Sequence, residues 1–127
     1  MKRVSREQIL LLHEKIISIS GDSKGVRDEN LLLSAINSPY QTFGSEDLYP
    51  SLIEKAVRLG YNLISNHPFI DGNKRIGVHA FFAYLDIHGV KLKYDDEDLI
   101  KLIFKVASGL MSYEEFLEWV KRHVVSE

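Results

Sequence analysis

The sequence predicts an all-α fold, a compact bundle of about six helices, and three observations support this prediction. Apolar residues recur every three or four positions along most of the chain. Several of these stretches follow a Ser with Gln or Glu three positions later, a pattern typical of helix starts. No long stretch shows the strict alternation of a half-buried strand. With 127 residues, 45% of them hydrophobic, the chain can build one core, so we expect a single domain over residues 1–127.

The first two helices are marked by residues at their ends. Ser5 and Gln8 form a capping-box pattern ahead of the first helix, and Gly21 predicts where that helix stops. Asp28 predicts the N-cap of a short leucine-rich helix, which has to end before Pro39.

Residues 37–50 show no helical period and contain two prolines, a glycine and three aromatic residues. We expect a long loop or a small hairpin here, and call this segment the flap. Long segments of this kind in compact domains are often functional.

The third helix is expected to start at Ser51, which is paired with Glu54 in a second capping-box pattern. It should end near Asn66, because Pro68 cannot continue a helix.

Four more features complete the predicted bundle. Residues 76–87, after Gly72, are apolar nearly all round, which predicts a central helix covered by its neighbours. Residues 90–94 are expected to be briefly extended. Acidic residues 95–98 favour the start of a fifth helix, and Ser112 with Glu115 predicts the start of a sixth.

Composition excludes several classes of function. The chain has no cysteine, which rules out disulfides, thiolate metal sites and a cysteine nucleophile. Its 16 basic and 18 acidic residues give a net charge of -2, so we expect no nucleic-acid partner. No stretch approaches the ~20 apolar residues that span a bilayer or resembles a signal peptide, so we expect a cytoplasmic protein with no membrane partner.

Side chains able to act in catalysis or to bind a ligand are most frequent in residues 67–75, whose sequence is His-Pro-Phe-Ile-Asp-Gly-Asn-Lys-Arg. A helix that starts after Gly72 would offer free backbone N–H groups to an anion, and Lys74 and Arg75 would add positive charge. Asp71 could hold Mg²⁺ together with nucleotide phosphates, and His67 could accept the proton of an attacking hydroxyl.

Each of these residues also has an ordinary structural interpretation. A single loop histidine, an Asp-Gly-Asn turn and a solvated basic helix turn are common in proteins. The conjunction of a base, a metal ligand and an anion cradle within nine residues instead predicts transfer of a phosphate ester.

The string H-x-F-x-D-G-N-K-R resembles the motif of the Fic/Doc family, whose usual form is H-x-F-x-(D/E)-G-N-(G/K)-R. Two further stretches, Gly-Val-Arg-Asp at 25–28 and Ser-Pro-Tyr-Gln-Thr-Phe-Gly at 38–44, resemble the death-on-curing (Doc) branch. The resemblance covers nearly the whole chain. It implies the Fic/Doc fold and a nucleotide-dependent protein transferase that uses ATP and Mg²⁺.

The resemblance also implies roles for individual residues. His67 would be the general base and Phe69 would point inward to anchor the loop. Asp71, Lys74 and Arg75 would complete the catalytic set, with Asp71 holding Mg²⁺. The nucleotide would be bound by Gly72, Asn73, Lys74 and Arg75. The flap would dock an extended part of the target protein by strand addition, through Tyr40, Thr42 and Phe43.

Two positions suggest which group is transferred. Lys74 stands where AMP-transferring members have Gly, and Val78 stands where they carry a second Arg. A Lys fills the space that a diphosphate needs and suits a single phosphoryl group. The resemblance to the Doc branch, which shares the Lys, implies a kinase acting on a target of the translation elongation factor class.

The same resemblance implies a toxin whose partner is an antitoxin. The self-silencing motif (S/T)-x-x-x-E-(G/N) is absent from the sequence, so we expect inhibition by an antitoxin in trans. Two alternatives stay open: an AMP transferase that holds the nucleotide the other way round, and a non-enzymatic interaction module.

The remaining histidines are expected to have no catalytic role, and His13 is interpreted as part of an apolar helix face. Six aromatic residues are expected in the core or at its edge: Tyr61, Phe81, Phe82, Tyr84, Phe104 and Trp119.

Overall fold

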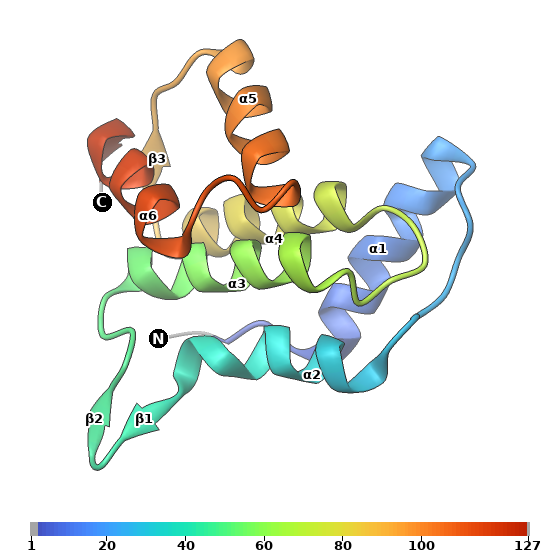
Figure 1. The fold of residues 1–127 in the computed structure, drawn as a ribbon, viewed down its shortest axis with the longest axis horizontal. Coiled ribbons are helices and arrows are strands. Elements are labelled where there is room, and N and C mark those ends of the chain that lie inside the picture. The colour runs from blue at the N-terminus through green and yellow to red at the C-terminus, as the bar shows by residue number, and fades with distance from the viewer. Residues whose placement is uncertain (1–2, 127) are drawn as a thin grey trace.

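The computed structural model describes residues 3–126 and confirms the predicted all-α bundle (Figure 1). Within these residues six α-helices are present: α1 Arg6–Ser20, α2 Glu29–Asn37, α3 Leu52–Asn66, α4 Asn73–Ile87, α5 Asp96–Ala107 and α6 Tyr113–His123. A 3₁₀ turn, η1, spans Ser38–Tyr40. The strands are short: β1 Thr42–Phe43, β2 Glu46–Asp47, β3 Lys91–Leu92 and β4 Val124–Ser126. No helix in the described part of the chain is long and apolar enough to cross a membrane.

The predicted helix caps are present. Ser5 and Ser51 each accept a hydrogen bond from the backbone N–H three residues on, and the side chain of that third residue accepts one in return. Ser112 makes the same reciprocal pair at the start of α6. Asp28 caps α2 through Leu31 N–H. Local sequence therefore fixes where four of the helices start.

Of the two forms expected for the flap, the structure shows the small hairpin, at residues 42–47, while Asn37 still belongs to α2 and Ser38–Tyr40 form η1. β1 and β2 pair antiparallel, with Thr42 opposite Asp47 and Phe43 opposite Glu46. The hairpin projects away from the bundle in Figure 1, and both strands are exposed.

Residues 90–94 are extended only at Lys91–Leu92, where β3 pairs with β4 at the end of the chain. β4 was not predicted. It is a three-residue strand whose pairing partner lies more than 30 residues earlier, so no local sequence pattern predicts it.

α4 starts at Asn73, directly after Gly72 as the anion cradle requires and three residues before the apolar stretch 76–87, because Gly72 takes the left-handed conformation (φ 78°) and serves as its N-cap. The prediction that its neighbours cover this helix on nearly all sides was wrong, since Ala83 is exposed and Ile87 is 49% exposed. The open side faces a shallow apolar groove shared with α1.

α3 and α4 lie side by side at the centre of the molecule, with α2 along one side and α5 and α6 on the other (Figure 1). The two central helices approach closely at Gly60 and Gly77. A Cβ on Gly77 would overlap the Cγ1 atom of Ile64, and one on Gly60 would lie 3.0 Å from Cβ of Phe81. The absence of side chains at these positions sets the spacing of the central pair.

Gly77→Ala is therefore expected to destabilise the protein, although Ala is the better helix former. The added methyl has to displace Ile64, at a cost of about 1–3 kcal/mol in the free energy of unfolding. Gly60→Ala should cost less, because its nearest contact is longer. Urea unfolding measures both losses. In an Ile64→Ala background the cost of Gly77→Ala should shrink, and an undiminished cost there would contradict the steric explanation.

Candidate functional site

The loop that joins α3 to α4, residues 67–72, borders a cavity of about 470 Å³. The other wall of the cavity comes from the C-terminal half of α5. The residues that line it come from the loop, the first turn of α4, the end of α5 and the residue after it: His67, Ile70, Asp71, Gly72, Asn73, Lys74, Phe104, Ala107 and Ser108. The predicted base, metal ligand and lysine therefore share one cavity, although α5 had not been predicted to contribute to it.

Arg75 does not line this cavity. Its guanidinium forms an ion pair with Asp22 just after α1, at 2.9 Å from Nη1 to Oδ2, with both side chains substantially exposed. It borders two neighbouring apolar hollows instead. The phosphate contact of Arg75 stays a prediction.

The N-terminus of α4 opens into the cavity at Gly72. Glycine has no side chain to cap the helix, so the first backbone N–H groups of α4 lack both intrahelical carbonyl partners and a capping oxygen. A Cβ at Gly72 would lie 3.0 Å from Cδ1 of Ile17, and the φ of 78° disfavours any other residue. The sequence here leaves a helix end that favours an anion.

Lys74 extends over the ring of Phe104, with Nζ 4.6 Å from the ring centroid. Phe104 is 56% exposed, so its assignment to the core was wrong. It lies on the outward face of α5, where it pairs with a cation and forms part of the cavity wall.

Asn73 is buried and holds the loop together. Its Oδ1 accepts a hydrogen bond from Phe69 N–H (2.9 Å), and its Nδ2 donates to the carbonyl oxygen of Phe69 (3.0 Å). The side-chain amide is therefore engaged with the loop, which leaves the backbone N–H of Asn73 as the group aimed at an anion. The predicted phosphate contact of this residue stays a prediction.

Phe69 points inward, as expected, and is 1% exposed. Its ring stacks on His13 from α1, with centroids 3.7 Å apart. Nε2 of His13 lies 2.8 Å from the carbonyl oxygen of Asp71. His13 is thus buried on an apolar helix face, as predicted, but it also supports the site loop. No local sequence pattern indicated that contact, because 58 residues separate His13 from Asp71.

Asp71 is half-buried, and its Oδ2 accepts a hydrogen bond from Ser23 N–H at 3.0 Å. No group of three or more His, Cys, Asp or Glu residues able to hold a metal occurs among residues 3–126. A Mg²⁺ ion at this place would take one carboxylate from the chain and the rest of its oxygen ligands from phosphates and water. That donor set fits the usual coordination of Mg²⁺ by a substrate nucleotide.

A second segment, residues 25–28, runs along the outer side of the loop. Val26 and Phe69 form an isolated antiparallel bridge, and Ile70 N–H donates to the carbonyl oxygen of Gly25 at 3.0 Å. Apart from the N-cap at Asp28, no structural role had been predicted for this segment.

The structure does not bring the flap to the cavity. The flap precedes the N-terminus of α3 and His67 follows its C-terminus, and 15 helical residues span about 22 Å. The two lie at opposite ends of α3 in Figure 1. The docking role predicted for Tyr40, Thr42 and Phe43 stays a prediction.

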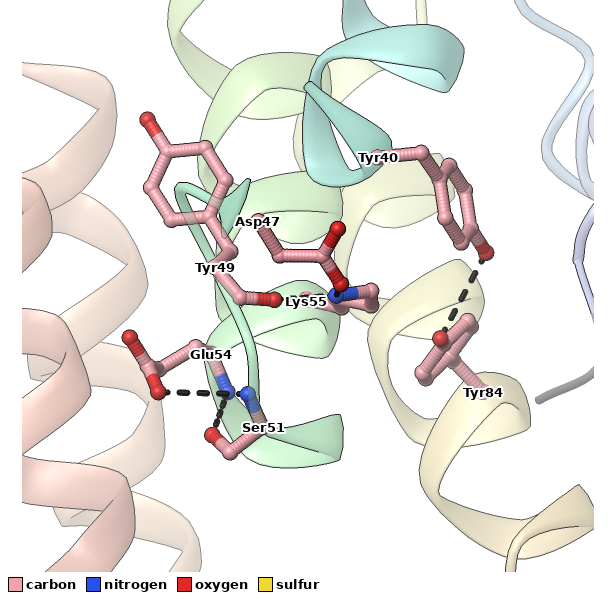
Figure 2. A network of polar contacts seen from close by, with 7 residues as sticks. All are labelled: Tyr40, Asp47, Tyr49, Ser51, Glu54, Lys55 and Tyr84. Atoms are coloured by element: carbon pink, nitrogen blue, oxygen red, sulfur yellow. Dashed lines mark hydrogen bonds and ion pairs between the residues drawn. The ribbon is translucent and has the colours of Figure 1, made fainter. Parts of the chain in front are cut away.

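A polar network fixes the base of the flap to the bundle (Figure 2). The buried Nζ of Lys55 donates to the backbone oxygen of Tyr49 and pairs with Asp47 at 3.2 Å. On the other side of the hairpin, the Tyr40 hydroxyl donates to that of Tyr84 at 3.4 Å. Burial raises the pKa of the Tyr84 hydroxyl well above its usual range. Phe43, near the tip of the hairpin, remains 81% exposed.

Comparison with known proteins gives a consistent result. The model of the family described as Fic/DOC matches residues 3–85 of this chain. The match includes α1 to α3, the site loop and most of α4.

Two curated relatives are similar over most of the chain. Toxin Doc of Mycolicibacterium smegmatis is 39% identical over 92 residues, which are 72% of this chain and 68% of that protein. Protein kinase doc of Escherichia phage P1 is 25% identical over 122 residues, which are 96% of this chain and 95% of the phage protein.

The contacts of Asn73 lead to a test of the loop. Asn73→Ala should lower the free energy of unfolding by about 1–3 kcal/mol, because it leaves the buried N–H of Phe69 without an acceptor. Urea unfolding measures that loss, and hydrogen exchange at the Phe69 amide should accelerate. Asn30→Ala, at an exposed position of α2, serves as the control and should change stability by less than about 0.5 kcal/mol. Equal losses in the two variants would show that the loop does not depend on Asn73.

Proposed function

Because this chain belongs to the Fic/DOC family, whose members are typically nucleotide-dependent transferases, we propose that it is a Doc-type toxin with kinase activity. It transfers the terminal phosphoryl group of ATP to a hydroxyl of a protein target of the translation elongation factor class and so blocks translation in the cytoplasm. The observation that carries this proposal is the single cavity lined by His67, Asp71 and Lys74 at the N-terminus of α4. Residues 1–127 act in this proposal as one Fic/Doc domain.

The proposed transfer divides the work among these residues. The phosphates of ATP lie against the free N–H groups at the start of α4, where the helix dipole favours negative charge. His67 takes the proton of the target hydroxyl, whose oxygen forms the new bond to the γ-phosphorus. The bond from that phosphorus to the oxygen bridging it to the β-phosphate breaks, and ADP leaves with the electron pair.

Asp71 is the residue that would hold Mg²⁺, through a carboxylate that borders the cavity. Bound Mg²⁺ supplies positive charge that neutralises the phosphate oxygens. The hydrogen bond from Ser23 N–H to Oδ2 fixes the orientation of this carboxylate before the nucleotide binds.

In the proposed reaction, the guanidinium of Arg75 exchanges the carboxylate of Asp22 for a phosphate of ATP. An exposed ion pair contributes little to stability, so a phosphate that offers two oxygens in the plane of the guanidinium can replace Asp22. Arg75 then stabilises the charge that develops during transfer.

Phosphoryl transfer rather than AMP transfer is supported by Lys74. Its ammonium group borders the cavity and provides a point charge for one phosphoryl group. The neighbouring Val78 brings no second guanidinium to hold a diphosphate leaving group. The phage P1 relative is itself named a protein kinase.

The proposal includes an antitoxin that inhibits the toxin in trans, as the name of the mycobacterial relative, a Doc toxin, suggests. The stretch from Thr42 to Glu46 has the spacing of a self-silencing motif, but it lies in the hairpin and not in a helix. The flap is proposed to dock the target, with the exposed edge of Phe43 as a contact.

Labelled ATP tests the type of transfer. Incubating the protein with a cell lysate should label a protein band from [γ-³²P]ATP and not from [α-³²P]ATP, and mass spectrometry of that band should find a phosphate adduct. His67→Ala should abolish labelling while leaving the fold intact, because the side chain is exposed. An adenylyl adduct would establish the AMP transferase instead. Absence of label from both nucleotides would favour a non-enzymatic module.

Asp71→Ala is expected to weaken binding of ATP in the presence of Mg²⁺ and to leave binding in EDTA nearly unchanged, because the lost group acts through the metal. Calorimetry with and without Mg²⁺ measures both affinities. Asp86→Ala, at an exposed position in the last turn of α4, is the matched control and should bind as the parent does. If Mg²⁺ strengthens ATP binding equally in both variants, Asp71 is not a ligand of the metal.

A further inference from the structure

His67 has an unusual backbone conformation for its position. It is the C-cap of α3, and among residues 3–126 it is the one non-glycine residue with positive φ (φ 49°, ψ 55°). A side chain disfavours this left-handed region, and a following proline pushes the preceding residue toward extended conformations. Pro68 is that proline. The conformation persists only if contacts from elsewhere hold it.

Three of those contacts come from one residue, Arg27. Its Nε donates to the carbonyl oxygen of His67 at 2.7 Å, and its Nη2 donates to the carbonyl oxygen of Asn66 at 3.0 Å. The backbone N–H of Arg27 donates to the next carbonyl, that of Pro68, at 2.8 Å. Three consecutive carbonyl groups around His67 thus accept hydrogen bonds from Arg27.

The residue after Arg27 fixes the position of Arg27 beside the loop. Asp28 N–H also donates to the Pro68 carbonyl oxygen, at 3.1 Å, and Asp28 itself caps α2. The N-terminus of α2 therefore fixes the backbone from which the Arg27 side chain extends.

The chemistry of the contact requires arginine. The last carbonyl groups of a helix lack intrahelical partners and carry the negative end of the dipole, so a cation there is favourable. The planar guanidinium presents two N–H groups to two adjacent oxygens at once, whereas a lysine ammonium reaches one such position as a point charge.

We infer that Arg27 is a positioning residue for the proposed general base: it fixes the peptide groups on both sides of His67 and so directs the imidazole into the cavity. The inference rests on the proposed function of His67. Arg27 itself does not line the cavity that holds the reacting groups. Its loss should leave nucleotide binding intact and slow the transfer step.

Kinetics of Arg27→Ala test this inference. With the kinase target of the labelling experiment as substrate, kcat is expected to fall about 10- to 100-fold, the range that follows a misplaced catalytic group, while KM for ATP stays within about twofold. Arg27→Lys keeps one charge at the helix end and should recover part of the lost kcat. Guanidinium ion, added to Arg27→Ala below denaturing concentrations, should also restore activity in part. Arg122→Ala, at an exposed position in the last turn of α6, is the control and should behave as the parent does.

A second readout is independent of activity. The imidazole ¹H–¹³C cross-peak of His67, identified by its absence in His67→Ala, should shift in Arg27→Ala and stay in place in Arg122→Ala. If the parent transfers no phosphoryl group, the proposed function fails, and this cross-peak alone decides the role of Arg27. An unmoved cross-peak, or a kcat for Arg27→Ala equal to that of Arg122→Ala, overturns the inference. If Arg27→Ala does not fold, the kinetics and the cross-peak are measured on Arg27→Lys instead.

Discussion

The close approach of α3 and α4 at Gly60 and Gly77 is the constraint on which the other features depend. The six residues between these helices have to reverse the chain direction, and the spacing of the helix axes sets the distance that they span. The loop adopts left-handed conformations at both of its ends, His67 and Gly72. The glycine takes its conformation at little cost, but the histidine does not.

The cost at His67 is offset by contacts from two directions. Residues 25–28 bind the outer side of the loop through backbone hydrogen bonds and the Arg27 guanidinium, and His13 stacks under Phe69 from α1. Asn73 closes the loop from within. Each contact alone contributes on the order of 1 kcal/mol, which is comparable to the strain of one left-handed residue. The loop is therefore held by a combination of segments from α1, the α1–α2 connection and α4.

This arrangement explains which features the sequence could predict. Helix starts depend on residues three positions apart, so Ser5, Ser51 and Ser112 were sufficient to place them. The motif at residues 67–75 is continuous, so its placement in a loop followed by a helix could be predicted as well. The helix start after Gly72 could be predicted as well, because a glycine followed by an apolar helical stretch marks a helix boundary, and the structure shows that Gly72 is the N-cap. The contacts of His13 and Arg27 with the loop, and of Phe104 with Lys74, connect residues that lie 30 to 58 positions apart, and no local sequence pattern carries that information.

The distance between the flap and the cavity limits the kind of target that could contact both. The flap is anchored through the buried charge of Lys55, and moving it toward the cavity would leave that charge without Asp47 and the Tyr49 carbonyl. The bundle between the two places is held by the Gly60–Gly77 contact, which does not deform easily. If a strand docks at the flap, the hydroxyl that reaches His67 therefore lies about one helix length away on the target. A short peptide that occupies only the flap cannot present that hydroxyl, so under the proposed function the chain recognises its target as a folded surface spanning both ends of α3.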